Sequence, residues 1–221
     1  MCAALTESAD YAKAAHAFFE EAWSDVDSMA VWKQDGDFTI RTKTVENADG
    51  SGIFMASGEV AKMDVKPEEF LPYFADWAGN VCEVNCNVLE AAVVGKLGAA
   101  PVIRWVTKTP FPLSNRVAFA AVYPELDDAA DLRFYMSSDG TEAIAKAQFY
   151  DVGEDATFAL VNIKMSGWSV KPLDGGSCRV RYAYSADLGG NVPRFVANKK
   201  APGIVDAALP GVEAWIKKRR A

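Results

Sequence analysis

The apolar side chains near the C-terminus recur at the three-to-four-residue spacing of an α-helix. The stripe lies within 187–220, after Gly189-Gly190, which ends the segment before it. Its members are Val192, Phe195, Val196, Val205, Ala208, Leu209, Val212, Trp215 and Ile216. This pattern predicts an amphipathic helix that buries one face. Because an interior proline breaks helical hydrogen bonding, Pro202-Gly203 and Pro210-Gly211 predict a kinked helix or two to three shorter pieces.

Two further helices are predicted upstream. The N-terminal helix falls within 1–25, where residues 7–23 carry apolar side chains at helical spacing. The segment 65–76 has Pro67 near its start and acidic residues in its first turn, which is typical of a helix N-terminus. We expect both helices to pack their apolar faces against the rest of the chain.

Between these helices the apolar pattern shortens to the period of β-strands. Hairpin-type turns at Asp35-Gly36 and at 49–52 separate the first three strands. The predicted strands are 29–32, 37–45, 52–63, 81–94, 102–109, 116–124, 131–138, 142–152, 158–172 and 178–188. Within 116–124 both faces are apolar, so both must be covered or must line an apolar space.

The order of elements predicts an α+β fold with one large antiparallel sheet. A single amphipathic helix that follows such a sheet must bury its stripe against it. We therefore expect a curved sheet wrapped around the C-terminal helix, 187–220, with space between them. No repeat or linker divides the chain, so residues 1–221 are interpreted as one domain.

Charge and composition narrow the choice of partners. The formal net charge is −7, which argues against a nucleic-acid backbone as ligand. The basic run 217–220 would favourably meet the dipole of a helix C-terminus, and contact with anionic headgroups is the alternative. No stretch reaches the roughly 18 apolar residues of a membrane span, and the first residues lack the features of a secretory signal. We therefore expect a cytoplasmic monomer.

Few residues are candidates for chemistry. The cysteines are expected to be free thiols, and Cys82 with Cys86 lacks the further ligands of a metal site, so we expect no metal and no cofactor. His16 is the only histidine. It falls on the N-terminal helix, no nucleophile motif appears in the sequence to partner it, and it is interpreted as a surface residue rather than a catalyst.

Three stretches carry a resemblance to a known family. They read VIRWVTKTPFPLSNR at 102–116, Gly-Trp-Ser at 167–169 with Lys171-Pro172, and RVRYAYSADLGGNVP at 179–193. Together with the element order, they resemble the START lipid-transfer domain family, and among its members those that transfer phosphatidylcholine. The similarity covers nearly the whole chain and is strongest from Trp77 onward.

This resemblance implies a helix-grip fold: a nine-stranded antiparallel sheet around a C-terminal helix that acts as a lid over one lipid. It places the entrance at the loop 109–115 and the last helix, with Phe111, Leu113 and Val192 beside it. Phe111 and Leu113 could enter a membrane during exchange or could pack under the lid, and the sequence leaves both open.

The resemblance also implies which side chains meet the headgroup. Trp105 matches a position that faces choline in phosphatidylcholine-binding members, where an aromatic ring attracts a quaternary ammonium; a plain core tryptophan is the alternative. A second aromatic is expected where this chain has Ala118, and a basic residue for the phosphate is expected where it has Phe74. Both departures weaken the case for phosphatidylcholine.

Glu83 matches a cavity acid of the sterol-binding members, whose arginine partner would fall on Val122. A buried carboxylate without a partner is costly, so Glu83 must find another cation, take a proton or be exposed. On a strand, an inward Glu83 would carry Asn85 and Asn87 inward with it. The apolar pattern alone favours the opposite orientation, with these three side chains outward, and a β-bulge would reconcile the two orientations. We take the inward orientation, as the resemblance implies.

We therefore expect a non-catalytic carrier or sensor that moves one lipid between membranes, with phospholipid first and a sterol, fatty acid or carotenoid as alternatives. Its partners would be the lipid and, transiently, a membrane surface. The expected ligand contacts are Glu83, Asn85, Asn87, Trp105, Ala118, Val122, Lys164, Phe195, Val196 and Val205. The competing hypotheses are an enzyme of the cyclase or hydrolase type on the same fold, with Glu83 as its acid or base, and a regulatory domain that binds another protein.

Overall fold

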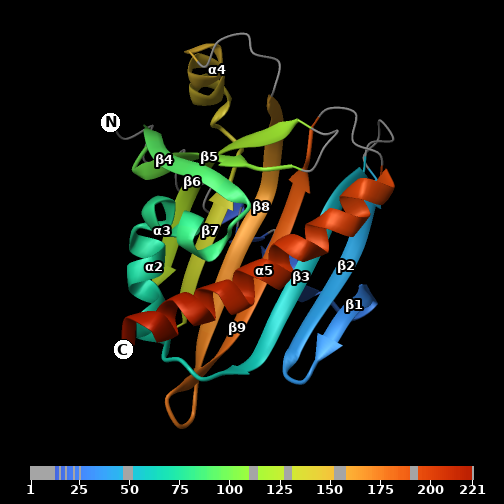
Figure 1. Ribbon diagram of the computed structural model, residues 1–221, viewed down its shortest axis with the longest axis vertical. Helices are drawn as coiled ribbons and strands as arrows, with labels where there is room; N and C mark the ends of the chain where they lie inside the picture. Colours follow the sequence, from blue (N-terminus) through green and yellow to red (C-terminus); the bar gives the residue numbers. More distant parts are fainter. Residues whose placement is uncertain are drawn as a thin grey trace.

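One nine-stranded sheet forms the body of the fold (Figure 1). The structure is a computed structural model that describes residues 13–14, 16–17, 19–21, 23–24, 26–46, 52–109, 114–126, 131–151, 158–189 and 194–220. The strands are β1 Ala30–Asp35, β2 Phe38–Glu46, β3 Gly52–Met63, β4 Val88–Leu97, β5 Ala100–Thr107, β6 Asn115–Leu126, β7 Leu132–Ser137, β8 Phe158–Leu173 and β9 Ser177–Asp187.

The strand order is β1-β2-β3-β9-β8-β7-β6-β5-β4, and every neighbouring pair is antiparallel. The first residues of β6 and of β8 also pair in a short parallel stretch, from Asn115 opposite Phe158 to Ala118 opposite Val161. β3 and β9 pair in the middle of the sheet although 113 residues of the chain lie between Met63, the end of β3, and Ser177, the start of β9. The predicted α+β class and nine-stranded antiparallel sheet are confirmed.

The helix α5, Arg194–Arg220, crosses the concave face of this sheet as a single element of 27 residues. The prediction of a helix broken at its prolines is wrong, because Pro202 and Pro210 both lie inside it. Val205, Leu209 and Val212 are fully buried along its length. Packing of this continuous apolar stripe outweighs the local cost of each proline.

Two short helices and a 3₁₀ turn lie beside the C-terminal half of α5. They are η2 Pro67–Phe70, α2 Leu71–Ala75 and α3 Trp77–Val84. The helix predicted at 65–76 is confirmed, but the strand predicted to begin at residue 81 is wrong, because α3 continues to Val84 and β4 begins at Val88. The Asp76 carboxylate caps α3 by accepting a hydrogen bond from the Gly79 backbone N–H (3.0 Å), and this cap starts a new helix.

The strand predicted at 142–152 is also wrong, since these residues form α4, Glu142–Asp151. Its first half is rich in alanine and charged helix formers, which outweighs its later aromatic residues. Ala145 packs in a small cluster with Val106, Val117 and Phe119 on the convex face of the sheet. The second face of β6 is thereby covered.

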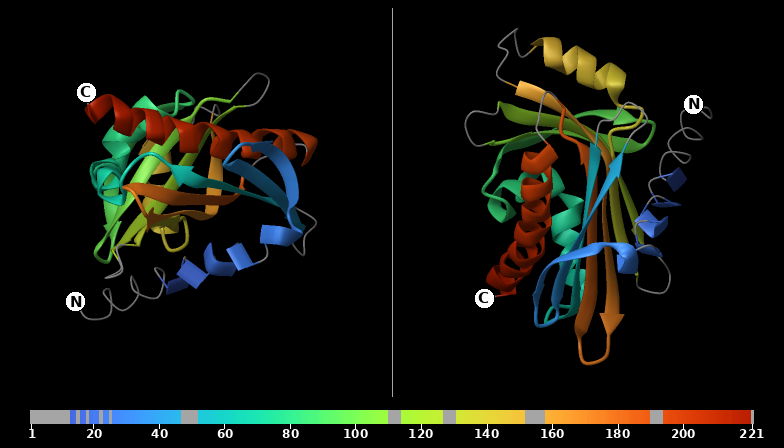
Figure 2. Two further views of the ribbon diagram at one scale, coloured as in Figure 1. Left: turned by 90° about the horizontal axis from the view of Figure 1, so that it is seen from below. Right: turned by 90° about the vertical axis from the view of Figure 1, so that its right-hand side faces the viewer.

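The sheet carries a core on each side. Figure 2 shows α5 on one face and the N-terminal helical residues, between 13 and 24, on the other. On the concave face the core includes Phe134, Val170 and Leu209, and on the convex face Phe19 and Trp23 pack with Met165 and Tyr135. Alternating side chains therefore serve two separate hydrophobic layers.

Candidate binding cavity

A small cavity of about 80 Å³ lies between the concave face of the sheet, α5 and the α2–α3 segment. Each wall comes from a different part of the chain. The strands β4, β5, β7, β8 and β9 supply the floor, α5 contributes Ile204 and Ala208, and α3 contributes Val81 and Val84. The cavity therefore exists only once the C-terminal helix has docked on the sheet.

The close approach of α5 to the sheet is set at one glycine of β3. A Cβ atom on Gly58 would lie 2.3 Å from Val205 Cγ1 and 2.8 Å from Leu209 Cδ1. Only a residue without a side chain fits at this crossing. Beside it, the cross-strand neighbour of Gly58 is Tyr182, whose ring reaches into the cavity.

Six aromatic residues contribute to the cavity wall. They are Tyr73, Trp77, Trp105, Trp168, Tyr182 and Tyr184. Trp77 and Trp105 meet edge to face with their ring centroids 5.3 Å apart, and Trp168 stacks on Tyr182 at 4.3 Å. Rings locked in these arrangements give the cavity a fixed, apolar shape.

The polar groups in the wall are neutral. The hydroxyl groups of Ser166 and Tyr182 are hydrogen-bonded to each other at 3.2 Å. Burial raises the pKa of Tyr182 to about 12, and burial together with the nearby Tyr182 raises the pKa of Tyr73 and of Tyr184. All three phenols therefore keep their protons at neutral pH. Among the lining residues in the described part of the chain, none has a charged side chain.

The phosphate-contact position of the resemblance is occupied by a packed aromatic side chain. Phe74 is buried and stacks on Phe134 with the ring centroids 4.6 Å apart. It also meets Trp168 edge to face. This corner of the concave core is therefore filled by hydrocarbon.

The structure brings some of the predicted contact residues to the cavity and not others. Trp105 and Asn85 line it. Ala118, Val122 and Val205 are buried in the surrounding core without lining the cavity. The placement of these residues is a property of the fold, and their contact with a ligand stays a prediction.

Two more predicted residues lie away from the cavity wall. Asn87 is exposed, and its backbone N–H donates to the Asn85 side-chain oxygen at 3.0 Å. Lys164 sits at the irregularity in the β8–β9 pairing between Ile163 and Met165, where the strand exchanges one face for the other. Neither side chain borders the cavity.

The inward orientation predicted for Glu83 is wrong. This residue lies in the last turn of α3 rather than on a strand, and 52% of its side chain is exposed. Its carboxylate accepts a hydrogen bond from the Arg219 guanidinium at 3.1 Å. The position that the resemblance implied for Glu83 is not a cavity position here, because the chain is helical up to Val84. The cation that Glu83 requires comes from the end of α5.

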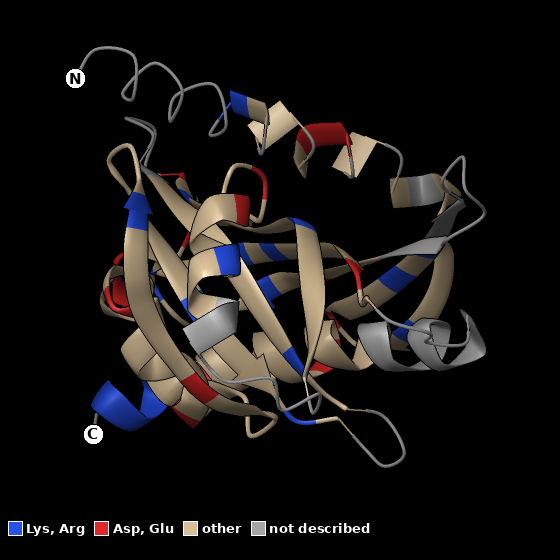
Figure 3. Cartoon of the chain, turned by 90° about the horizontal axis from the view of Figure 1, so that it is seen from above, with Lys and Arg blue, Asp and Glu red and all other residues tan. Residues whose placement is uncertain are grey.

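The C-terminal end of α5 is held by several such contacts. Arg220 hydrogen-bonds the Glu69 carboxylate, and its Nη1 donates to the Asp64 carbonyl at 3.1 Å. The Arg219 guanidinium also stacks over the Trp215 ring at 3.7 Å. Figure 3 shows the Lys and Arg positions gathered at this end of the helix. Part of the basic run is therefore engaged within the protein.

Several predicted contacts fall where the structure describes no side chain. The entrance residues Phe111, Leu113 and Val192 lie outside the described residues. Phe195 and Val196 belong to α5, but their side chains are outside the described part. Their roles stay predictions.

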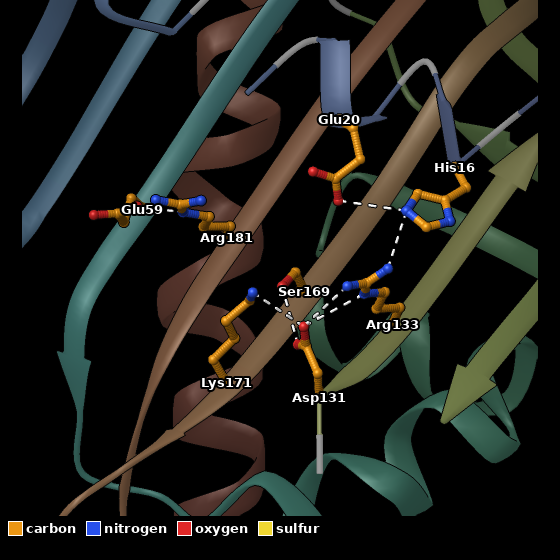
Figure 4. Close-up of polar contacts among 8 residues, drawn as sticks. All are labelled: His16, Glu20, Glu59, Asp131, Arg133, Ser169, Lys171 and Arg181. Carbon is orange, nitrogen blue, oxygen red and sulfur yellow. Dashed lines mark hydrogen bonds and ion pairs between the residues drawn. The ribbon is translucent and has the colours of Figure 1, made fainter. Parts of the chain in front are cut away.

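A polar network occupies the convex face, away from the cavity (Figure 4). Asp131 accepts hydrogen bonds from Arg133 and Ser169 and pairs with Lys171 at 3.2 Å. His16 Nε2 lies 3.0 Å from an Arg133 nitrogen, and the imidazole stacks on Tyr135. His16 is thus a helical residue packed against the outer face of the sheet rather than a freely exposed one.

Sequence reasoning missed the polar side of the cavity. Tyr182 and Tyr184 alternate along β9 inside the stretch 179–193 that carries the family resemblance, and Ser166 on β8 directly precedes the Gly-Trp-Ser stretch 167–169. Their period of two was visible in the sequence. What was not visible is which face points toward α5, because both faces of these strands are buried.

Two searches of the described residues concern other kinds of site. No group of three or more His, Cys, Asp or Glu side chains is placed to hold a metal ion in the part of the chain that the structure describes. Over the same residues, no helix is both long and apolar enough to cross a membrane.

Comparison with solved structures shows a START-type fold. Human StAR-related lipid transfer protein 5 superposes with a TM-score of 0.80 and 13% identity, over 98% of this chain and 99% of that chain. Human STARD10 superposes with a TM-score of 0.71 and 17% identity, over 92% and 78%. A STAR-related lipid transfer protein fragment from Xanthomonas axonopodis gives 0.64 and 15%, over 86% and 98%.

No family model and no curated protein matches the sequence. At these low identities the structural likeness concerns the fold alone. The nine-stranded sheet and the C-terminal helix of this chain match the helix-grip arrangement of those structures.

Proposed function

We propose that the protein belongs to the START family and carries one lipid between membranes in the cavity under α5, without chemical change to that lipid. The observation that supports this most directly is the cavity itself, which is rich in aromatic residues, has no charged side chain among its described lining residues and is covered in part by the C-terminal helix. Such walls replace water by hydrocarbon around an apolar ligand. The START-type fold adds support, because the named structures of that fold include lipid transfer proteins.

A carrier is required because lipids scarcely dissolve in water as monomers. Each methylene exposed to water costs about 0.8 kcal/mol. A lipid with two acyl chains, on the order of 30 methylenes, therefore leaves a bilayer only when another apolar surface receives it. The cavity wall and the underside of α5 provide that surface.

The cavity must enlarge to receive a whole lipid. Its volume of about 80 Å³ is well below the roughly 300–1,000 Å³ of typical small-molecule sites. The walls that can separate without breaking the sheet are α5 and the α2–α3 segment. We propose that α5 moves away from β3 during loading, and that Phe111, Leu113 and Val192 guide the lipid at the membrane.

The sequence prediction named phospholipid first. A buried phosphate needs a cationic partner, and the described lining residues contain none. We therefore propose a lipid ligand without assigning a phosphate to it.

The enzymatic alternative depended on Glu83. This carboxylate is exposed, is paired with Arg219 and does not line the cavity. It is therefore not placed to act as acid or base on a ligand inside the described cavity. A Glu83→Gln variant should accordingly transfer lipid as the unchanged protein does.

Native mass spectrometry of the purified protein, combined with transfer of fluorescent lipid between vesicles, tests the proposal. Ala208→Phe fills the cavity from α5 and should abolish transfer, because Ala208 lines it. Ala214→Phe is the matched control on the exposed side of the same helix and should leave transfer unchanged. A folded protein that carries no lipid, and that transfers none from vesicles of mixed composition, would refute the proposal.

A further inference from the structure

One cavity-lining residue carries a hydroxyl group that no described residue binds. Tyr184 is only 8% exposed and lines the cavity, yet its hydroxyl forms no hydrogen bond with any residue in the described part of the chain. Buried phenols usually find a partner. A hydroxyl that faces a cavity can obtain that partner from a ligand.

The neighbouring hydroxyls place this group in a small polar corner. Tyr184 lies directly opposite Ser166 in the β8–β9 pairing, and Ser166 is hydrogen-bonded to Tyr182 at 3.2 Å. Trp168, stacked on Tyr182, limits the corner on one side. Three hydroxyl-bearing side chains from two adjacent strands thus line the cavity next to one another, Tyr184 beside the bonded Ser166–Tyr182 pair.

We infer that Tyr184, with the Ser166–Tyr182 pair beside it, forms the subsite that recognises the polar end of the ligand, and that this subsite selects a neutral hydroxyl or carbonyl group over a phosphate. The inference rests on the proposed lipid-binding function and names the chemistry of its ligand.

The electrostatics of the wall exclude an anionic group. An ionised phosphate in a buried site requires paired cations or metal, since desolvation of a single ion costs several kcal/mol. Hydroxyl groups can donate one hydrogen bond and accept others, which suits an alcohol or a carbonyl. Because the phenols stay protonated at neutral pH, they are available as donors throughout the physiological range.

The size of the cavity agrees with this role. A volume of about 80 Å³ accommodates a few water-sized groups, which is the size of a hydroxyl or ester end rather than of a complete lipid. The subsite is therefore already formed, whereas the space for the tail is created when α5 moves.

The test compares two lipids with the same tail and different polar ends. Monooleoylglycerol is neutral, and oleoyl-lysophosphatidate carries a phosphate in place of one hydroxyl. Binding is followed by the emission of the cavity residues Trp77, Trp105 and Trp168. We expect monooleoylglycerol to bind more than about a hundredfold tighter than oleoyl-lysophosphatidate.

Single-atom variants locate the recognition. Tyr184→Phe should weaken binding of monooleoylglycerol about three- to tenfold, the value of one hydrogen bond, and Ser166→Ala should weaken it by a similar factor. Tyr123→Phe is the matched control, since Tyr123 is buried with the convex-face core, and it should bind as the unchanged protein does.

The outcomes separate this inference from the proposed function. Equal or tighter binding of oleoyl-lysophosphatidate, or a Tyr184→Phe variant with unchanged affinity, would overturn the inference while leaving the lipid carrier in place. Failure to bind either probe, together with no transfer of any lipid between vesicles, would remove the carrier function itself.

Discussion

Gly58 shows how a single residue determines the distance between α5 and the sheet. Its missing side chain allows Val205 and Leu209 to sit directly on β3. The larger residues that favour strands would hold the helix away. The cavity beside this crossing is therefore small because α5 packs directly on the backbone of Gly58.

Replacing this glycine should disturb the molecule measurably. Gly58→Ala would place a methyl group 2.3 Å from Val205 Cγ1, and overpacking of this kind typically costs about 1–3 kcal/mol of unfolding free energy. Urea denaturation would measure the loss. Gly203→Ala is the control within α5, because nothing lies within 4 Å of its added Cβ, and it should be neutral or stabilising by about 0.5–1 kcal/mol. Equal stability of the two variants would contradict the close packing described for Gly58.

Individual site residues were only partly predictable from the sequence. Trp105 was found through its place in a recognisable stretch, and it lines the cavity. Glu83 was placed in the cavity because the resemblance implied it, against the apolar pattern of the strand assumed there. Both arguments took residues 81–88 to be a strand, whereas the Asp76 cap begins a helix that continues to Val84.

At the scale of elements, α5 shows that local sequence can also predict a break where the structure has none. Its two prolines predict breaks, but the helix continues because Val205, Leu209 and Val212 remain on one buried face throughout. Local propensity can be read from the sequence, whereas the packing that overrides it depends on strands far away in the chain. In α4, by contrast, local propensity decides, because helix formers outweigh an aromatic stretch.

The C-terminal end of α5 is fixed by charge as well as by packing. Hydrogen bonds from Arg220 and from the Lys66 backbone hold the pKa of Glu69 at about 2, below its usual value of 4.5. Because the carboxylate is favoured in the folded state, its contribution to stability is present above about pH 4.5 and is lost as the pH falls toward 2.

This anchoring predicts a pH-dependent difference between variants. Glu69→Gln should be less stable than the unchanged protein near neutral pH, and the difference should shrink between about pH 4.5 and 2, as thermal unfolding would show. High salt should reduce it as well, because the pair is near the surface. Glu68→Gln is the neighbouring control, with an exposed carboxylate, and should show no such convergence. A difference that grew on acidification would contradict the assigned ion pair.

The whole molecule consists of two hydrophobic layers that share one sheet. Gly167 connects them: a Cβ there would lie 2.6 Å from Phe19 on the convex face, while the next residue, Trp168, lines the cavity on the concave face. The Gly-Trp-Ser stretch that carries part of the family resemblance thus serves both layers. The sequence showed that both faces are apolar but not which helix covers which.

The outer layer should control stability more than ligand binding. Phe19→Ala should lower the unfolding free energy by about 3–5 kcal/mol, because Phe19 is 2% exposed and packs on Tyr135. The folded fraction should bind lipid as before. Leu89→Ala, at a position 52% exposed on the edge strand β4, should change stability by less than about 0.5 kcal/mol. A Phe19→Ala variant as stable as Leu89→Ala would show that the N-terminal segment does not pack as described.

The small volume of the cavity under α5 has a consequence for the affinity of the proposed ligand. On the proposed loading route, each uptake would first separate Val205 and Leu209 from Gly58. The free energy of that opening would be subtracted from the attraction between ligand and wall, and release of the ligand would return it. The proposed carrier would therefore bind its ligand less tightly than one whose cavity stands open.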